Sequence, residues 1–159
     1  ALSTPEIEVF PDYTADALKQ TAFDKQGNIS HKVSAKTMEL YQELGFTHFA
    51  EPTFTFFANN EIWTVSADEG TLYENSNDKK LILEQNVTAI NLNKESIIQK
   101  ITALKIEVNI ESSVMTSDQP VTLIGPKLRV QGLGLIAHIK DKQLSLTEHT
   151  HTELYNVQK

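Results

Sequence analysis

Two histidines near the end of the chain, His149 and His151, have the spacing of a metal site. On a β-strand, residues i and i+2 point to the same side, so both imidazoles could bind one zinc ion. A third ligand would be needed, and His138 or Glu153 could supply it. The alternative is a pair of solvated histidines on the polar face of a terminal strand. We favour this alternative and expect no metal and no cofactor.

A glycine pattern, G-L-G-L-I-A, occupies residues 132–137 and fits the dinucleotide-binding fingerprint G-x-G-x-x-A. Glu153 follows at about the distance expected of a ribose-binding carboxylate. However, too few residues follow Ala137 to build the rest of a nucleotide-binding sheet, and residues 133–139 alternate as a strand does. We therefore expect Gly132 and Gly134 to mark a bulge or a close approach of two strands.

The composition also limits the classes of function. The chain has 159 residues, 40% of them hydrophobic, no cysteine and a formal net charge of -7. Its length favours a single domain. The negative charge argues against nucleic acid and anionic membrane surfaces as partners. The sequence contains no cysteine nucleophile, no G-x-S-x-G or H-E-x-x-H motif and no recognisable pair of catalytic carboxylates. We predict that the protein is not an enzyme, and a small hydrolase remains the minority alternative.

Alternation of apolar and polar residues dominates the sequence. In residues 104–111 one face would hold four apolar side chains: Leu104, Ile106, Val108 and Ile110. The same period recurs in residues 63–67, 121–123, 133–139 and 144–147, with polar turns between them. Such runs are typical of half-buried strands in an antiparallel sandwich, roll or barrel. An all-β fold of many short strands is therefore predicted.

Three segments fit this pattern less well. Residues 34–44 are rich in good helix formers, and residues 95–104 have apolar residues at helical spacing, so a helix is an alternative in both. Residues 1–20 show little periodicity. They are expected to form a poorly ordered arm or an edge strand.

Aromatic residues gather in the first half of the chain. Phe49, Phe54 and Phe56 lie close in sequence to Trp63. They could form the core of a closed sandwich. They could equally line an open apolar trough that binds acyl chains, because core and trough use the same residue types.

Several motifs in order resemble the LptC family. Residues 63–68 read W-T-V-S-A-D and resemble its W-x-V-x-A-D segment, and residues 27–35 resemble its glycine-led strand. Residues 49–52 resemble its F-x-x-P step. Residues 121–125 and 132–133 resemble its V-T-L-x-G and the G-L that follows. The family often has glycine before the valine of a strand pair, where this chain has Asn86 and Pro120.

The resemblance implies a twisted, V-shaped β-jellyroll of the OstA-like type, antiparallel and open at both ends, over residues 13–159. Residues 1–12 would be a flexible arm, following a single membrane helix that this chain lacks. The domain would lie in the periplasm, tethered to the inner membrane. It would bind lipopolysaccharide in an apolar groove and pass it from an inner-membrane ABC transporter to an LptA-like bridge protein of the same fold. A structural tether, or a carbohydrate- or lipid-binding β-domain without a transfer role, is the alternative.

The resemblance and the strand pattern together give the expected site residues. Leu18, Phe49 and Leu144 match lipid-facing positions of the family. The other expected lipid contacts are apolar residues of the dry faces: Phe54, Phe56, Leu104, Ile106, Val108, Leu123 and Leu146. Partner contacts by strand addition are expected at the two ends of the sheet. They involve Gly27, Gly125, Leu154 and Tyr155, and a homodimer through the same edges is possible.

Overall fold

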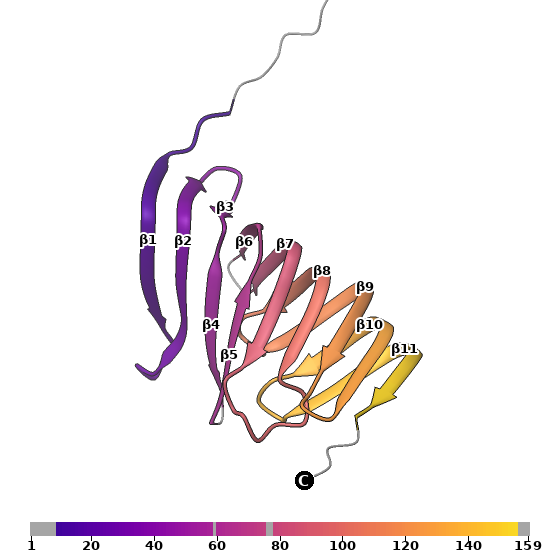
Figure 1. Cartoon of the computed structure of the whole chain (residues 1–159). Helices are drawn as coiled ribbons and strands as arrows, with labels where there is room; N and C mark the ends of the chain where they lie inside the picture. Colours follow the sequence, from indigo (N-terminus) through magenta and orange to yellow (C-terminus); the bar gives the residue numbers. More distant parts are fainter. Residues whose placement is uncertain (1–8, 59, 76–77, 156–159) are drawn as a thin grey trace, which may run out of the picture.

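The computed structural model describes residues 9–58, 60–75 and 78–155, which form strands and turns and contain no helix. Figure 1 shows the strands running along the domain from β1 at one end to β11 at the other, and their hydrogen-bonded order is β11-β10-β9-β8-β7-β5-β4-β2-β3-β6, with β1 beside β2. Their bounds are β1 (Tyr13–Phe23), β2 (Ile29–Tyr41), β3 (Phe46–Ala50), β4 (Thr53–Ala58), β5 (Glu61–Ser66), β6 (Glu69–Asn75), β7 (Asp78–Asn91), β8 (Lys100–Asn109), β9 (Val114–Ile124), β10 (Leu128–His138) and β11 (Gln143–Leu154). The predicted all-β antiparallel fold is confirmed.

Two long strands divide their pairing between two partners. The first part of β2 pairs with β4 and the second part with β3. Likewise, β7 pairs first with β6 and then with β5. Because β3 and β6 pair with each other, and so do β4 and β5, the sheet splits into two layers. We call the layer that contains β3 and β6 layer A, and the one that contains β4 and β5 layer B.

Strands β7 to β10 contribute one half to each layer and bend where they cross from one to the other. The pairing is interrupted by bulges between Glu84 and Val87 in β7 and between Leu133 and Leu135 in β10. A bulge adds an unpaired residue and bends its strand sharply. Asn86 has a φ of 52°, in the left-handed region that glycine and asparagine tolerate best. These bends form a corner along which layers A and B meet.

The core lies between the two layers. Its buried members come from both, including Phe54, Val65 and Leu123 of layer B and Leu81, Val108 and Met115 of layer A. Along β4 and β5 every second side chain is buried, as the period-two pattern predicts. Each layer has one face in solvent and one face against the other layer. Burial of the apolar side chains between the layers is thus the main stabilising contribution to this fold.

The two helical alternatives are wrong. Residues 29–41 belong to β2, and residues 100–104 belong to β8, which follows an irregular stretch. Both segments pair with neighbours on two sides, and this pairing overrides their modest helix propensity.

The expectation that Leu104 shares the buried face of β8 is also wrong. Leu104 is 62% exposed, whereas Ile106 and Val108 are fully buried. The register with β9 shifts between Ala103 and Glu107, so the alternation starts anew after the corner. Leu133 is exposed for the same reason, since the bulge in β10 follows it. The prediction that the 132–134 glycines mark a bulge is confirmed, and Gly134 has a φ of 77°.

Both ends of the sheet carry a strand with one free edge. In the described ranges β1 pairs only with β2, and β11 only with β10. Residues 13–20 therefore form part of an edge strand, which was one of the two expectations for this segment. Residues 1–8 lie outside the described part of the chain, so the division into an arm of 1–12 and a domain of 13–159 stays a prediction.

Candidate functional site

The interior between the layers is aromatic at the end nearer β1. Phe49 of layer A meets Phe54 of layer B edge to face, with ring centroids 5.5 Å apart. Phe54 stacks with Phe56 at 6.1 Å, and the ring of His31 lies 6.2 Å from that of Phe54. Burial lowers the pKa of His31, and the positive charge of Lys79 lowers this pKa further. The side chains fill this end, so it is a packed core.

Toward β11 the two layers leave a cavity of about 350 Å³, which we call the interlayer cavity. Trp63 and Leu123 of layer B line it, facing Met115, Ala137 and Leu144 of layer A. Ile97, on the loop between β7 and β8, lies beside it and is 71% exposed. Cavities of this size with apolar walls are typical of sites for small apolar ligands.

A charged pair crosses the same cavity between the layers. Glu61 begins β5 in layer B, and Lys142 lies in the turn before β11 in layer A. The Nζ atom of Lys142 is 4.0 Å from Oε1 of Glu61. The Glu61 side chain is only 6% exposed, and its Oε2 atom is buried without a hydrogen-bond partner among the residues that the structure describes. Asn91, Ser96, His138 and Gln143 also line the cavity, so its largely apolar walls carry several polar groups besides this buried carboxylate.

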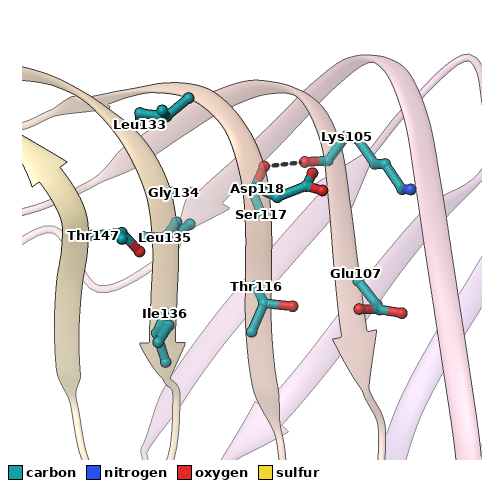
Figure 2. A pocket seen from close by; sticks show the side chains of 10 residues that line it. All are labelled: Lys105, Glu107, Thr116, Ser117, Asp118, Leu133, Gly134, Leu135, Ile136 and Thr147. Carbon is teal, nitrogen blue, oxygen red and sulfur yellow. Dashed lines mark hydrogen bonds between the residues drawn. The ribbon is translucent and has the colours of Figure 1, made fainter.

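A second hollow lies on the outside of the corner. Figure 2 shows its side chains coming from four neighbouring strands, β8 to β11. The Ser117 hydroxyl donates a hydrogen bond of 2.6 Å to the backbone oxygen of Lys105. Glu107 and Thr116 alternate with the buried Val108 and Met115, so they point outward. With its charged rim, this hollow is a poor shelter for hydrocarbon.

The expected lipid-contacting residues fall into three groups. Six are buried between the layers: Phe49, Phe54, Phe56, Ile106, Val108 and Leu123. Leu18 of β1, and Leu144 and Leu146 of β11, are partly buried against the core at the two ends. Leu104 lies on the outside of the corner. Only Leu123 and Leu144 line the interlayer cavity.

The expected partner-contacting residues are likewise divided. Leu154 is 79% exposed at the end of the edge strand β11, and the Tyr155 amide extends the pairing by donating to the Lys127 carbonyl oxygen at 2.7 Å. Gly27 lies in the turn between β1 and β2, where its φ is 84°. Gly125 lies in the β9–β10 turn, where a Cβ would overlap the carbonyl oxygen of Ile97.

His149 and His151 lie on the exposed half of β11. His149 Nε2 is 2.6 Å from the Thr152 hydroxyl, and His151 Nε2 is 3.3 Å from a Glu153 carboxylate oxygen. No cluster of three or more His, Cys, Asp or Glu side chains in the described ranges could hold a metal ion. The same ranges contain no helix that is long and apolar enough to cross a bilayer.

The sequence reasoning did not identify Glu61 as a site residue. Its position offered a signal, because Glu61 precedes the apolar Ile62 and Trp63 directly after a polar turn. The neighbour of this carboxylate, Lys142, is distant in sequence and faces it only because β5 and the β10–β11 turn meet at the opening between the layers.

These features define a class: a two-layer β-jellyroll with an apolar interior and a free strand edge at each end. The sequence model of the family described as "Lipopolysaccharide-assembly, LptC-related" matches residues 4–156. The lipopolysaccharide export system protein LptC of Escherichia coli (strain K12) is 27% identical over 150 residues, which cover 93% of this chain and 76% of that protein. The protein of the same name from Haemophilus influenzae (strain Rd) is 26% identical over 168 residues, covering 94% and 78%.

The chain therefore belongs to the LptC family, as its motifs predict. Its role is in lipopolysaccharide transport, and this role is not enzymatic.

Proposed function

We propose that this domain shelters the acyl chains of lipopolysaccharide between layers A and B while the molecule passes from an inner-membrane ABC transporter to an LptA-like bridge protein. The observation that carries the proposal is the apolar interlayer cavity, with Leu123 on one side and Leu144 on the other. Burial of each acyl CH₂ group is worth about 0.8 kcal/mol, so even a short length of chain gains considerable shelter.

The two free edges support the handover. An edge strand presents unpaired backbone N–H and C=O groups that another strand can complete. We assign the β1 edge, with Leu18 and the Gly27 turn, to the transporter, and the β11 edge, with Leu154 and Tyr155, to the bridge protein. The same edges would allow two isolated domains to pair as a homodimer. For Gly125 we propose a packing role against the loop that carries Ile97.

We propose that the domain works in the periplasm, tethered to the inner membrane. The energy for transport comes from the transporter, and the domain supplies a passive apolar path. The competing function is a tether that joins the two partners while lipid passes elsewhere. A tether has no need for an apolar cavity between its layers, so we favour a domain that itself carries the lipid.

Photo-crosslinking tests the proposal. A benzoylphenylalanine at Leu144, in the anchored full-length protein with the transporter and ATP, is expected to capture lipopolysaccharide. The same group at Lys80, whose side chain is 47% exposed and paired with Glu107, serves as the control. Equal labelling at the two positions would favour the tether.

A further inference from the structure

The interlayer cavity contains a group that acyl chains alone do not explain. Glu61 Oε2 is buried and has no hydrogen-bond partner in the described part of the chain, and Trp63, Leu123 and Leu144 give the same cavity a largely apolar lining. A buried acceptor without a donor is unfavourable, whereas a leucine in its place would carry no such penalty. A donor group that reaches this oxygen would remove the penalty.

Lys142 does not fill this role. Its Nζ atom is 4.0 Å from Oε1, beyond the 2.7–3.2 Å of a hydrogen bond, and its side chain is 53% exposed. Lys142 therefore offsets the charge of Glu61 from the rim of the cavity. Among the described residues, the second oxygen is left without a donor.

We propose that Glu61 recognises a hydroxyl group on an acyl chain held in the interlayer cavity. This inference rests on the proposed function and specifies the ligand class: a hydroxylated acyl chain is preferred over a plain one. The hydroxyl donates to Oε2 while the rest of the chain packs against Trp63 and Leu123. Hydrogen bonds to a charged acceptor are about twice as strong as neutral ones, so a single hydroxyl suffices for discrimination.

A hydroxyl fits the cavity better than an ammonium group does. Lys142 already supplies the positive charge beside Glu61, and a second cation would be repelled by it. Bringing an ammonium group into apolar walls also costs far more desolvation free energy than bringing in a hydroxyl.

The test uses two neutral probes that differ in one atom: methyl 3-hydroxydecanoate and methyl decanoate. Trp63 is the single tryptophan of the chain and lines the cavity, so its fluorescence reports occupancy directly. We expect both esters to bind the full chain saturably and the hydroxylated ester to bind about tenfold tighter. In Glu61→Leu this preference is expected to vanish while methyl decanoate still binds.

Glu43→Leu is the matched control, because Glu43 is an exposed carboxylate in the turn after β2 and should leave the preference intact. Equal affinity of the wild-type chain for the two esters overturns the inference but leaves the proposed function intact. This comparison does not require any variant to fold. A preference that persists in Glu61→Leu overturns it as well. If neither ester binds, both the inference and the proposed function fail.

Discussion

The rings of Phe49 and Phe54 meet edge to face with their centroids 5.5 Å apart, although they belong to opposite layers. Only the residues around Pro52 separate them in sequence, and Pro52 itself is fully buried. The F-x-x-P step thus turns the chain from layer A into layer B and joins the layers through the two rings. The first half of the domain is closed at this point, while the second half opens into the interlayer cavity.

Removal of the Phe54 ring should therefore weaken the whole domain. Phe54 is 0% exposed, and truncation of a buried phenylalanine costs about 3–5 kcal/mol. We expect Phe54→Ala to lower the free energy of unfolding by this amount in urea titrations. Phe23→Ala is the control, because Phe23 is 63% exposed and should change stability by less than about 0.5 kcal/mol. Similar losses in the two variants would show that the ring contacts do not join the layers.

The corner in β8 can be tested with one pair of substitutions. Leu104 and Val108 lie on the same face of an ideal strand, but the bulge exposes Leu104 and leaves Val108 buried. We expect Leu104→Glu to change stability by less than about 0.5 kcal/mol. Val108→Glu buries an unpaired carboxyl group and should cost more than about 4 kcal/mol. The unfolding transition of this variant should then lie below the temperature range of the measurement. Equal damage from both would mean that β8 is a regular strand without a corner.

Two turn glycines should respond differently to asparagine. Gly27 has a φ of 84° and open space around it, so Gly27→Ala should cost about 1–2 kcal/mol and Gly27→Asn clearly less. At Gly125 any side chain meets the carbonyl oxygen of Ile97, and both Ala and Asn should cost about 1–3 kcal/mol. The free energies of unfolding of the four variants check this. Rescue by asparagine at Gly125 would contradict the predicted clash.

The stability of the domain should depend on pH through His31. Because its pKa is lowered from 6.5 in the folded chain, the unfolded chain binds more protons at and just below that pH. Stability contributed by neutral His31 is therefore complete above about pH 6.5 and declines as the pH falls below this value. The urea midpoint, measured between pH 7.5 and 5, should drop less in His31→Phe than in the wild type.

His138→Gln provides the control for this series, because His138 is exposed on β10. It is expected to keep the wild-type pH dependence. A slope that is the same in all three proteins would assign the effect to other groups.

The fold class could be predicted because the side chains of most strands alternate regularly between a solvent-exposed face and a buried face. Trp63 and Val65 face the core as the pattern in β5 predicts. Leu104 was misplaced because a bulge resets the alternation, and single-sequence periodicity does not record where a strand changes register.

The site was predicted less completely than the fold. Apolar residues such as Leu123 and Leu144 were identified from their faces, and both line the interlayer cavity. The pattern could not distinguish packed core from cavity, which is why the buried Phe54 and the cavity-lining Leu144 received the same role. Glu61 was missed because its environment is created by the β10–β11 turn, far along the chain.

The central claim, that acyl chains lie between the layers, can be tested most directly with spin labels on neighbouring residues of β11. The chain contains no cysteine, so Leu144→Cys and Ser145→Cys each give a single labelling site. Leu144 is partly buried toward the cavity, whereas Ser145 is exposed on the other face. Addition of purified lipopolysaccharide should reduce the mobility of the nitroxide at position 144 and leave that at 145 unchanged. An unchanged spectrum at 144, or an equal change at both positions, would contradict the account.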